Sequence, residues 1–342
     1  MKIMFTKLAP AAVILLALPI LSASAGEKPF PQVVDALDSS WPEGFAIGKG
    51  HTAYNGSVDG SIYKVDLRSG KGAVLNPQET PDPMDCLKLG MRVDSRTNNL
   101  FVAGCWYENL LVYDADTGEV KADYQLGPMF ESLVNDLAIT NNAVYVTDSF
   151  LPVIYRLPLA KNGGLPPNAD GVTTIDLPPE FIMDFDNDPC CGGNGIVATP
   201  NGKTLIIGHS LLSALYRVDP ATGEVIEIEV SPPLTGFLDG LVMHGRTLYI
   251  MNPDWELVQV VELDKEMLTG EFVGTMYDSN MSGVASGALF GKSLYVNNAH
   301  YDACCELDED GEILLDEEGN PVLIYTERTI TKLNRHDVDP VE

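Results

Sequence analysis

The stretch Cys190–Ser210, CCGGNGIVATPNGKTLIIGHS, decides the fold. Two apolar runs, at 196–199 and 204–208, flank a Pro-Asn-Gly turn, which is the pattern of two strands in a β-meander. An Asn-Gly pair, ordinarily a turn signal, stands at the start of the first strand. This position needs an explanation, because the chain repeats the arrangement elsewhere with a different first residue.

The same pattern recurs through the chain at regular intervals. A two-residue step precedes each first strand, and the six steps are Glu43-Gly44, Leu89-Gly90, Asn135-Asp136, Asn194-Gly195, Asp239-Gly240 and Ser286-Gly287. Each unit continues with a second and a third run rich in β-branched and aromatic residues, and units one to five add a weaker fourth, such as 225–230 (VIEIEV) in unit four. Four-strand repeats of about 45 residues are typical of propeller blades.

The sequence therefore predicts an all-β fold, a six-bladed β-propeller. Unit six lacks a fourth strand after its third run, and the N-terminal run 32–37 (QVVDAL) is expected to supply it. That pairing would close the ring and leave no open sheet edge. Two separate β-sandwiches are the alternative, which the even spacing disfavours.

The first 25 residues have the pattern of a secretory signal peptide. A basic start precedes an apolar run at 11–21 and a small-residue cleavage site, Ala23-Ser24-Ala25. We expect residues 26–342 to form a single propeller domain that is secreted or periplasmic, without a membrane span after signal cleavage. The net charge of −28 argues against nucleic acid and anionic membranes as partners.

The first residue of each step should lie at one end of the central channel, because the first strand of each blade lines it. The converging set is Glu43, Leu89, Asn135, Asn194, Asp239 and Ser286. Carboxylates brought together in this way repel unless a cation lies between them. Carboxylate, amide and hydroxyl oxygens suit Ca²⁺. Each residue could instead be only a turn former, but that does not explain Glu43.

The phrases WPEGFAI, VNDLAIT, GNGIVATPNGKTLIIGHSLLSALYRVD and LDGLVM resemble the senescence-marker-protein and gluconolactonase family. Its relatives include paraoxonase-like lactonases and diisopropylfluorophosphatase. The resemblance covers about residues 30–337 and implies a six-bladed propeller with calcium in the channel. It also implies four metal ligands, which fall on Glu43, Asn135, Asn194 and Asp239, and a base or nucleophile at Asp239.

Two departures from the family pattern bear on the substrate. Sugar-lactone members have an Arg two residues before the blade-three Asn, and Leu133 stands there instead, which disfavours a sugar lactone. No histidine matches the paraoxonase dyad clearly. His209 and His300 end second strands near the channel opening, where either could shuttle a proton or simply be a hydrogen-bonded histidine.

Apolar residues are concentrated in the loops that should surround the channel opening. They are Trp41, Trp106, Tyr107, Phe130, Phe150, Leu151, Phe181, Leu211, Leu212 and Trp255. An aromatic rim over a metal pocket favours an apolar or aromatic ligand, with Trp106, Phe150 and Trp255 as the candidate contacts. The alternative is that these side chains bury one another.

The six cysteines, in an exported chain, are expected to form disulfides. Cys86 and Cys105 are the favoured pair. Cys190–Cys191 and Cys304–Cys305 could each be vicinal disulfides or could pair between loops. Asp184, Asp186 and Asp188 resemble the start of an EF-hand loop, but Pro189 replaces the glycine that such a loop needs.

An acidic insertion, at about 300–328, interrupts blade six and contains DACCELDEDGEILLDEE at 302–318. We expect a hairpin turning at 318–320, either a solvated flap or a second calcium site. Taken together, the sequence predicts a secreted calcium-dependent hydrolase of a lactone or other ester, with an apolar or aromatic substrate. The alternative is a non-catalytic, calcium-stabilised propeller that binds a ligand or partner through its aromatic face.

Overall fold

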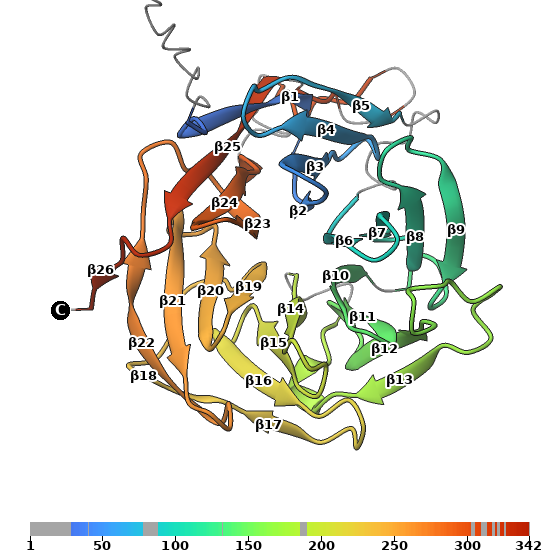
Figure 1. The fold of residues 1–342 in the computed structure, drawn as a ribbon, viewed down its shortest axis with the longest axis vertical. Helices are drawn as coiled ribbons and strands as arrows, with labels where there is room; N and C mark the ends of the chain where they lie inside the picture. The colour runs from blue at the N-terminus through green and yellow to red at the C-terminus, as the bar shows by residue number, and fades with distance from the viewer. Residues whose placement is uncertain are drawn as a thin grey trace, which may run out of the picture.

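The computed structural model shows six β-sheets arranged as blades around a central axis (Figure 1). It describes residues 29–39, 41–77, 88–131, 133–184, 190–301, 305–308, 313–316, 319, 322–324 and 326–341. The predicted six-bladed propeller is confirmed. The predicted signal peptide lies outside the described residues.

Each blade is an antiparallel meander that runs outward from the axis. The first strands are β2 (Phe45–Ile47), β6 (Met91–Asp94), β10 (Val134–Ile139), β14 (Gly193–Ala198), β19 (Leu241–His244) and β23 (Val284–Phe290). The second strands are β3 (Thr52–Gly56), β7 (Asn99–Ala103), β11 (Ala143–Asp148), β15 (Leu205–His209), β20 (Thr247–Asn252) and β24 (Ser293–Asn298). The third strands are β4 (Ile62–Asp66), β8 (Asn109–Asp114), β12 (Val153–Pro158), β16 (Ala214–Val218), β21 (Leu257–Leu263) and β25 (Thr326–Asn334).

The outermost strands include the strand that closes the ring. They are β5 (Gly72–Asn76), β9 (Val120–Gln125), β13 (Thr173–Asp176), β17 (Val225–Glu227), β22 (Thr269–Met276) and, in blade six, β1 (Val33–Ser39). β1 pairs antiparallel with β25, with Val34 opposite Ile330. Val34 and Ala36 also pack against Phe45 of blade one in a buried apolar cluster. The N-terminal strand thus closes the ring, as the sequence predicted.

Blade four differs from the prediction of one continuous fourth strand over 225–230. β17 ends at Glu227, and β18 (Glu229–Ser231) pairs in parallel with β22 of blade five. The chain crosses at Ile228, whose N–H donates to Leu215 of blade four, while the next N–H donates to Leu268 of blade five. The two-residue strand β26 (Asp339–Pro340) pairs with the same β22.

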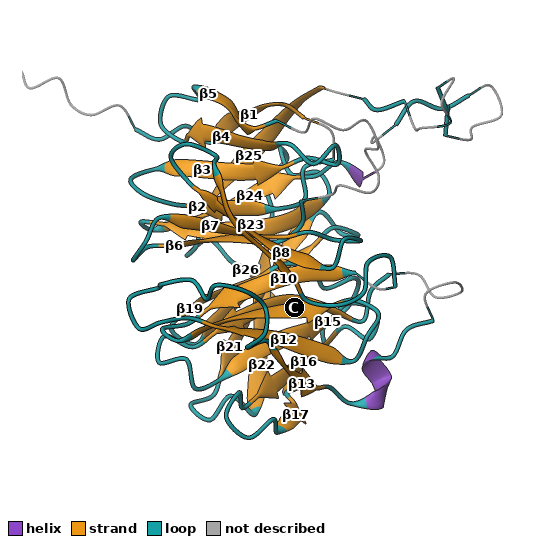
Figure 2. Cartoon of the chain, turned by 90° about the vertical axis from the view of Figure 1, so that its right-hand side faces the viewer, coloured by secondary structure: helices purple, strands orange, loops and turns teal. Residues whose placement is uncertain are grey.

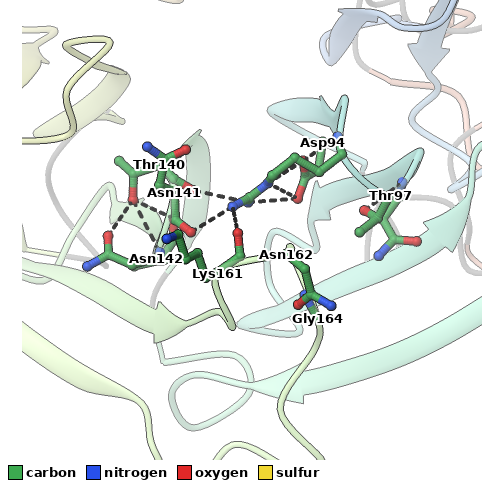
Figure 3. A network of polar contacts seen from close by, with 11 residues as sticks. Asp94, Thr97, Thr140, Asn141, Asn142, Lys161, Asn162 and Gly164 are labelled. Atoms are coloured by element: carbon green, nitrogen blue, oxygen red, sulfur yellow. Dashed lines mark hydrogen bonds and ion pairs between the residues drawn. The ribbon is translucent and has the colours of Figure 1, made fainter.

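Apolar side chains fill the spaces between neighbouring sheets. One cluster joins blades two and three through residues such as Phe101, Val112 and Leu137, which are fully buried. At the far ends of these two blades, Arg96 donates to the carbonyl oxygens of Thr140 and Asn141 while its guanidinium contacts Asp94 (Figure 3). Polar and apolar contacts therefore both hold adjacent blades together.

The loops project from two opposite faces of the ring (Figure 2). The top face carries the loops that enter each first strand and those that join second to third strands, including the 3₁₀ helix η1 (Pro179–Phe181). The described parts of the acidic insertion are also there, and they form two antiparallel bridges, between Leu307 and Ile313 and between Cys305 and Leu323. Of the predicted turn at 318–320, only residue 319 is among the described residues. Across the described residues, no helix is both long and apolar enough to cross a membrane.

Candidate functional site

A cavity of about 600 Å³ opens on the top face at the central channel. Its floor contains four of the sequence-predicted residues, Glu43, Asn135, Asn194 and Asp239. Ser286, from the sixth repeat unit, is buried but does not line it. The walls are mainly apolar and include Trp41, Leu89, Trp106, Leu133 and Phe237. The structure therefore brings the four predicted metal ligands together below an apolar opening.

In blades three and four the turn-like residues lie in irregularities of the first strands. The pairing of β10 with β11 shifts register between Val134 and Leu137, around Asn135. The pairing of β14 with β15 shifts between Gly193 and Ile196, around Asn194. Bulges of this kind re-aim a side chain without ending the sheet. This explains why an Asn-Gly pair stands at the start of a strand.

The glycine that follows the polar residue is needed for close packing of adjacent blades. A Cβ at Gly195 would meet the carbonyl oxygen of Asp239, in the first-strand segment of the next blade. A Cβ at Gly90 would likewise meet Asp136. At Gly195 and Gly90 only glycine permits this close approach between neighbouring blades, whereas unit three has Asp136 at the same repeat position.

Neighbouring hydrogen bonds fix the orientation of the asparagine side chains. The Asn135 amide N–H donates to Ser149 Oγ at 3.0 Å, and the Ser149 hydroxyl donates to the carbonyl of Gly193 at 2.9 Å. This leaves the Asn135 oxygen without a hydrogen bond, although the residue is only 5% exposed. The buried oxygens Asn194 Oδ1 and Glu43 Oε2 have no hydrogen-bond partner either. Unpaired buried acceptors are costly unless a cation or donor meets them.

The two floor carboxylates are held in an environment that favours their protonated forms. Burial raises the pKa of Asp239 to about 7, although hydrogen bonds from Tyr301 and Asn194 act in the opposite direction. Burial, followed by the carboxylates of Asp239 and Asp136, raises the pKa of Glu43 well above its ordinary value. A divalent cation would reverse both shifts, because it stabilises the charged forms.

Asp136 and Arg92 form an ion pair beside this floor, a feature that the sequence reasoning missed. The guanidinium of Arg92 lies 3.1 Å from Asp136, whose side chain is only 4% exposed. The same carboxylate accepts a hydrogen bond from the backbone N–H of Ile196. Arg92 also lowers the pKa of Glu43, so its charge reaches the floor of the cavity. The sequence signal that could have revealed this ion pair is Asp136 itself, which stands where the other five units have glycine.

Tyr301 is a second site residue that the sequence reasoning missed. It lines the cavity and donates a hydrogen bond from its hydroxyl to Asp239 Oδ2 at 3.1 Å. Burial raises the pKa of Tyr301 well above its ordinary value, so the hydroxyl stays protonated and acts as a donor. It follows the second strand of blade six, directly after His300, in a loop without a repeat pattern.

Replacing Tyr301 by Phe is expected to weaken calcium binding about tenfold or more, because a hydrogen bond to a charged group contributes about 1.5–3 kcal/mol. Without this donor the pKa of Asp239 rises, and protons compete better with the metal. Calorimetric titration with calcium at pH 7 measures the change. Tyr277→Phe, which alters an exposed tyrosine on the same face, is the control. Equal calcium affinities for the two variants would contradict a role for Tyr301.

The two candidate histidines do not line the cavity. His209 is 1% exposed, and its Nε2 atom lies 2.8 Å from the carbonyl oxygen of Glu180. Burial lowers the pKa of His209. The proton-shuttle interpretation is therefore replaced by the hydrogen-bonded one for His209. His300 has a positive φ of 51° and its backbone N–H donates to Ser282, while the neighbouring Tyr301 side chain reaches the cavity.

The predicted aromatic rim is only partly present. Trp106 lines the cavity, but Phe150 is 5% exposed and packs behind it, with ring centroids 6.4 Å apart. Trp255 is 61% exposed and lies outside the cavity lining. Trp41 and Phe237 line the cavity, whereas Phe150 and Trp255 do not. Trp41 packs edge-on against Tyr301, with ring centroids 5.6 Å apart.

Cysteines also border the cavity. Cys105, Cys190 and Cys191 line it, and the sulfur atoms of the adjacent Cys190 and Cys191 are in contact. The Asn135 amide lies 4.0 Å from Cys191 Sγ, so this pair borders the floor. The favoured Cys86–Cys105 pairing and any Cys304–Cys305 pairing involve Cys86 and Cys304, which lie outside the described residues.

Alkylation of the native protein is expected to label few or no thiols, because the oxidising compartment predicted from the sequence favours disulfides. Labelling after reduction gives the total for comparison. Intact-mass measurement of the two samples counts the reactive thiols, and peptide mapping locates those at Cys190 and Cys191. Six freely labelled thiols in the unreduced native protein would refute the prediction.

Comparison with known proteins supports the fold and not a specific activity. A scan against protein-family models finds no match, and a search of curated proteins finds none. Among solved structures, a regucalcin from Agrobacterium tumefaciens, a calcium-binding protein, is 17% identical with a TM-score of 0.59, over 90% of this chain and 95% of that one. The Malassezia sympodialis allergen Mala s 1 is 13% identical with a TM-score of 0.63, over 92% and 99% of the two chains. This chain is therefore similar in fold to regucalcin and Mala s 1.

Proposed function

We propose that this protein is a secreted calcium-dependent hydrolase of a lactone or other ester. The observation that carries the proposal is the floor of the cavity, where oxygen donors from four different blades meet. Three buried oxygens there, on Glu43, Asn135 and Asn194, have no hydrogen-bond partner. Hard, partly anionic oxygen donors without other partners fit calcium better than zinc or copper.

Glu43, Asn135, Asn194 and Asp239 would hold the metal. Calcium bound there would polarise the carbonyl group of an ester and stabilise the negative charge that develops on its oxygen. The calcium-binding regucalcin has the same fold, which supports the choice of metal. The hydrogen bond from Asn135 to Ser149 keeps the amide oxygen turned away from Ser149 and available to the cation.

Asp239 is the residue of this floor best placed to move a proton. Tyr301 and Asn194 fix its carboxylate, and Tyr301 keeps its own proton. An ionised Asp239 can accept a proton from an attacking water or attack the carbonyl itself. The apolar walls, including Trp106 and Leu133, exclude water and favour an apolar or aromatic ester.

The test is a panel of lactones and aryl esters, assayed with calcium and with a chelator. We expect hydrolysis of at least one apolar ester, lost on chelation and restored by calcium. Chelator-insensitive hydrolysis would contradict a calcium-dependent enzyme. No hydrolysis with tight calcium binding would favour the non-catalytic propeller instead, an alternative that the lack of a lining histidine among the described residues supports.

A further inference from the structure

We propose that the cavity selects a ligand with an apolar body and a positively charged end, and that Asp254 and Glu256 recognise that charge. The proposal concerns the substrate class and rests on the proposed function only for the reacting group. It follows from three features of the described residues: the charges that line the cavity, the distribution of cations over the two faces, and the aromatic walls.

The cavity lining is acidic at both ends. Glu43 and Asp239 lie on the floor, and Asp254 and Glu256 are exposed at the opening. No lysine, arginine or histidine belongs to the described lining. One calcium ion bound on the floor would balance the two floor carboxylates, and the described lining offers no cation to balance the two at the opening. A negative opening with apolar walls attracts cations and repels anions.

The top face as a whole shows the same imbalance. In its described loops the only lysine or arginine is Lys88, which is 7% exposed, and Arg328, near the start of β25, is 3% exposed. Exposed carboxylates such as Glu131 and Glu180 lie there as well. The loops of the opposite face hold many exposed cations, including Lys49, Lys71, Lys161, Lys203, Arg246 and Lys292. The total charge of the chain therefore does not explain the acidic opening, because cations are present and lie elsewhere.

The loop that carries Asp254 and Glu256 is held in place over the cavity. It joins β20 to β21, and Asp254 Oδ2 accepts a hydrogen bond from the backbone N–H of Phe237 at 3.0 Å. The backbone N–H of Glu256 donates to the carbonyl of Pro253 at 3.3 Å. Phe237 and Pro253 also line the cavity, so the two carboxylates lie beside an apolar wall.

Aromatic walls complete a site for an organic cation. Trp41, Trp106, Phe237 and Tyr301 all line the cavity. Ring faces attract ammonium groups, and an alkylated ammonium loses less hydration than a metal ion when it enters such a pocket. A volume of about 600 Å³ suits a molecule of drug-like size, with its ester on the floor and its charge at the opening. A carboxylate or phosphate group on the ligand would instead be repelled by Asp254 and Glu256 at the opening.

The experiment compares two matched compounds of equal shape. They are 3-(trimethylammonio)acetanilide and 3-tert-butylacetanilide, which replace the ester by an amide so that binding is measured without hydrolysis. Quenching of tryptophan fluorescence at saturating calcium gives both dissociation constants. We expect the cationic compound to bind more tightly by about tenfold. Raising the salt concentration should reduce this ratio, because salt screens exposed charges.

The double variant Asp254→Asn/Glu256→Gln should bring the ratio between the two compounds close to one. The matched control is Glu227→Gln/Glu271→Gln, which removes two exposed carboxylates from the outer strands β17 and β22 and should keep the wild-type ratio. Equal binding of the two compounds by the wild type would overturn the proposal. A double variant that weakens calcium binding and leaves the ratio unchanged would also overturn it, and would assign these carboxylates to metal capture.

The same design separates this proposal from the proposed function. The corresponding phenyl acetates, one cationic and one neutral, report hydrolysis by the wild-type protein. Preferential binding of the cationic amide without hydrolysis of either ester would reject the hydrolase and retain the ligand class. Hydrolysis of both esters with equal kcat/KM would retain the hydrolase and reject the ligand class.

Discussion

Replacing Asp239 by Asn is expected to lower kcat by a factor on the order of 10² or more, typical of the loss of a general base. The asparagine keeps the shape and one oxygen ligand of the aspartate but cannot accept a proton. Its neighbours Tyr301 and Asn194 remain, so the side chain stays in place. The measurement is kcat at saturating calcium, on the ester that the panel identifies, together with the melting temperature as a check on folding.

Glu43→Gln is the matched control, because it removes the other carboxylate from the same floor. If Asp239 moves the proton and Glu43 only binds calcium, raising calcium should restore kcat for the Glu43 variant and not for the Asp239 variant. Full recovery of the Asp239 variant at saturating calcium would contradict its catalytic role and leave it a metal ligand.

The propeller ring could be predicted because each repeat unit has a recognisable pattern within a short stretch of sequence. Each blade needs a small step into its first strand and alternating apolar runs after it, and both can be counted without knowing any contact. The closing strand followed from the same count, since blade six lacked a partner for β25. The run at 225–230 could not be assigned in the same way. Its division between two blades depends on the neighbouring β22, which no local pattern encodes.

The floor of the candidate site could be predicted for the same reason, and its walls could not. Equivalent positions of a repeat converge on the axis. Two residues at the same repeat position, such as Glu43 and Asp239, can therefore be predicted to lie together in the channel. Tyr301 and Phe237 come from loops that differ from blade to blade, and their side chains reach the cavity through non-repeating geometry. Phe150 shows the reverse case, because its loop position was right and its side chain turns into the core behind Trp106.

Calcium binding is expected to weaken steeply as the pH falls, and this is the second large effect. The pKa of Asp239 in the metal-free protein is about 7, against an ordinary value of 3.8. A raised pKa means that this group stabilises the metal-free fold fully below about pH 3.8, and that the contribution is lost as the pH rises through about 7. Calcium acts in the opposite sense, because it binds the ionised carboxylate and must displace the proton.

Proton competition at Asp239 alone should lower the apparent calcium affinity about 50-fold between pH 7 and pH 5. Glu43, whose pKa is also raised, adds to this loss. Above pH 7 the affinity should level off with respect to Asp239, because the carboxylate is then already ionised. Melting curves with and without calcium, recorded from pH 5 to pH 8, test the prediction, since a ligand raises the melting temperature only where it binds. We expect a large calcium-dependent increase at pH 8 and a small one at pH 5. A calcium-dependent increase of the same size at both pH values would show that no buried carboxylate exchanges a proton for the metal, and the floor formed by Glu43 and Asp239 would then not be the calcium site.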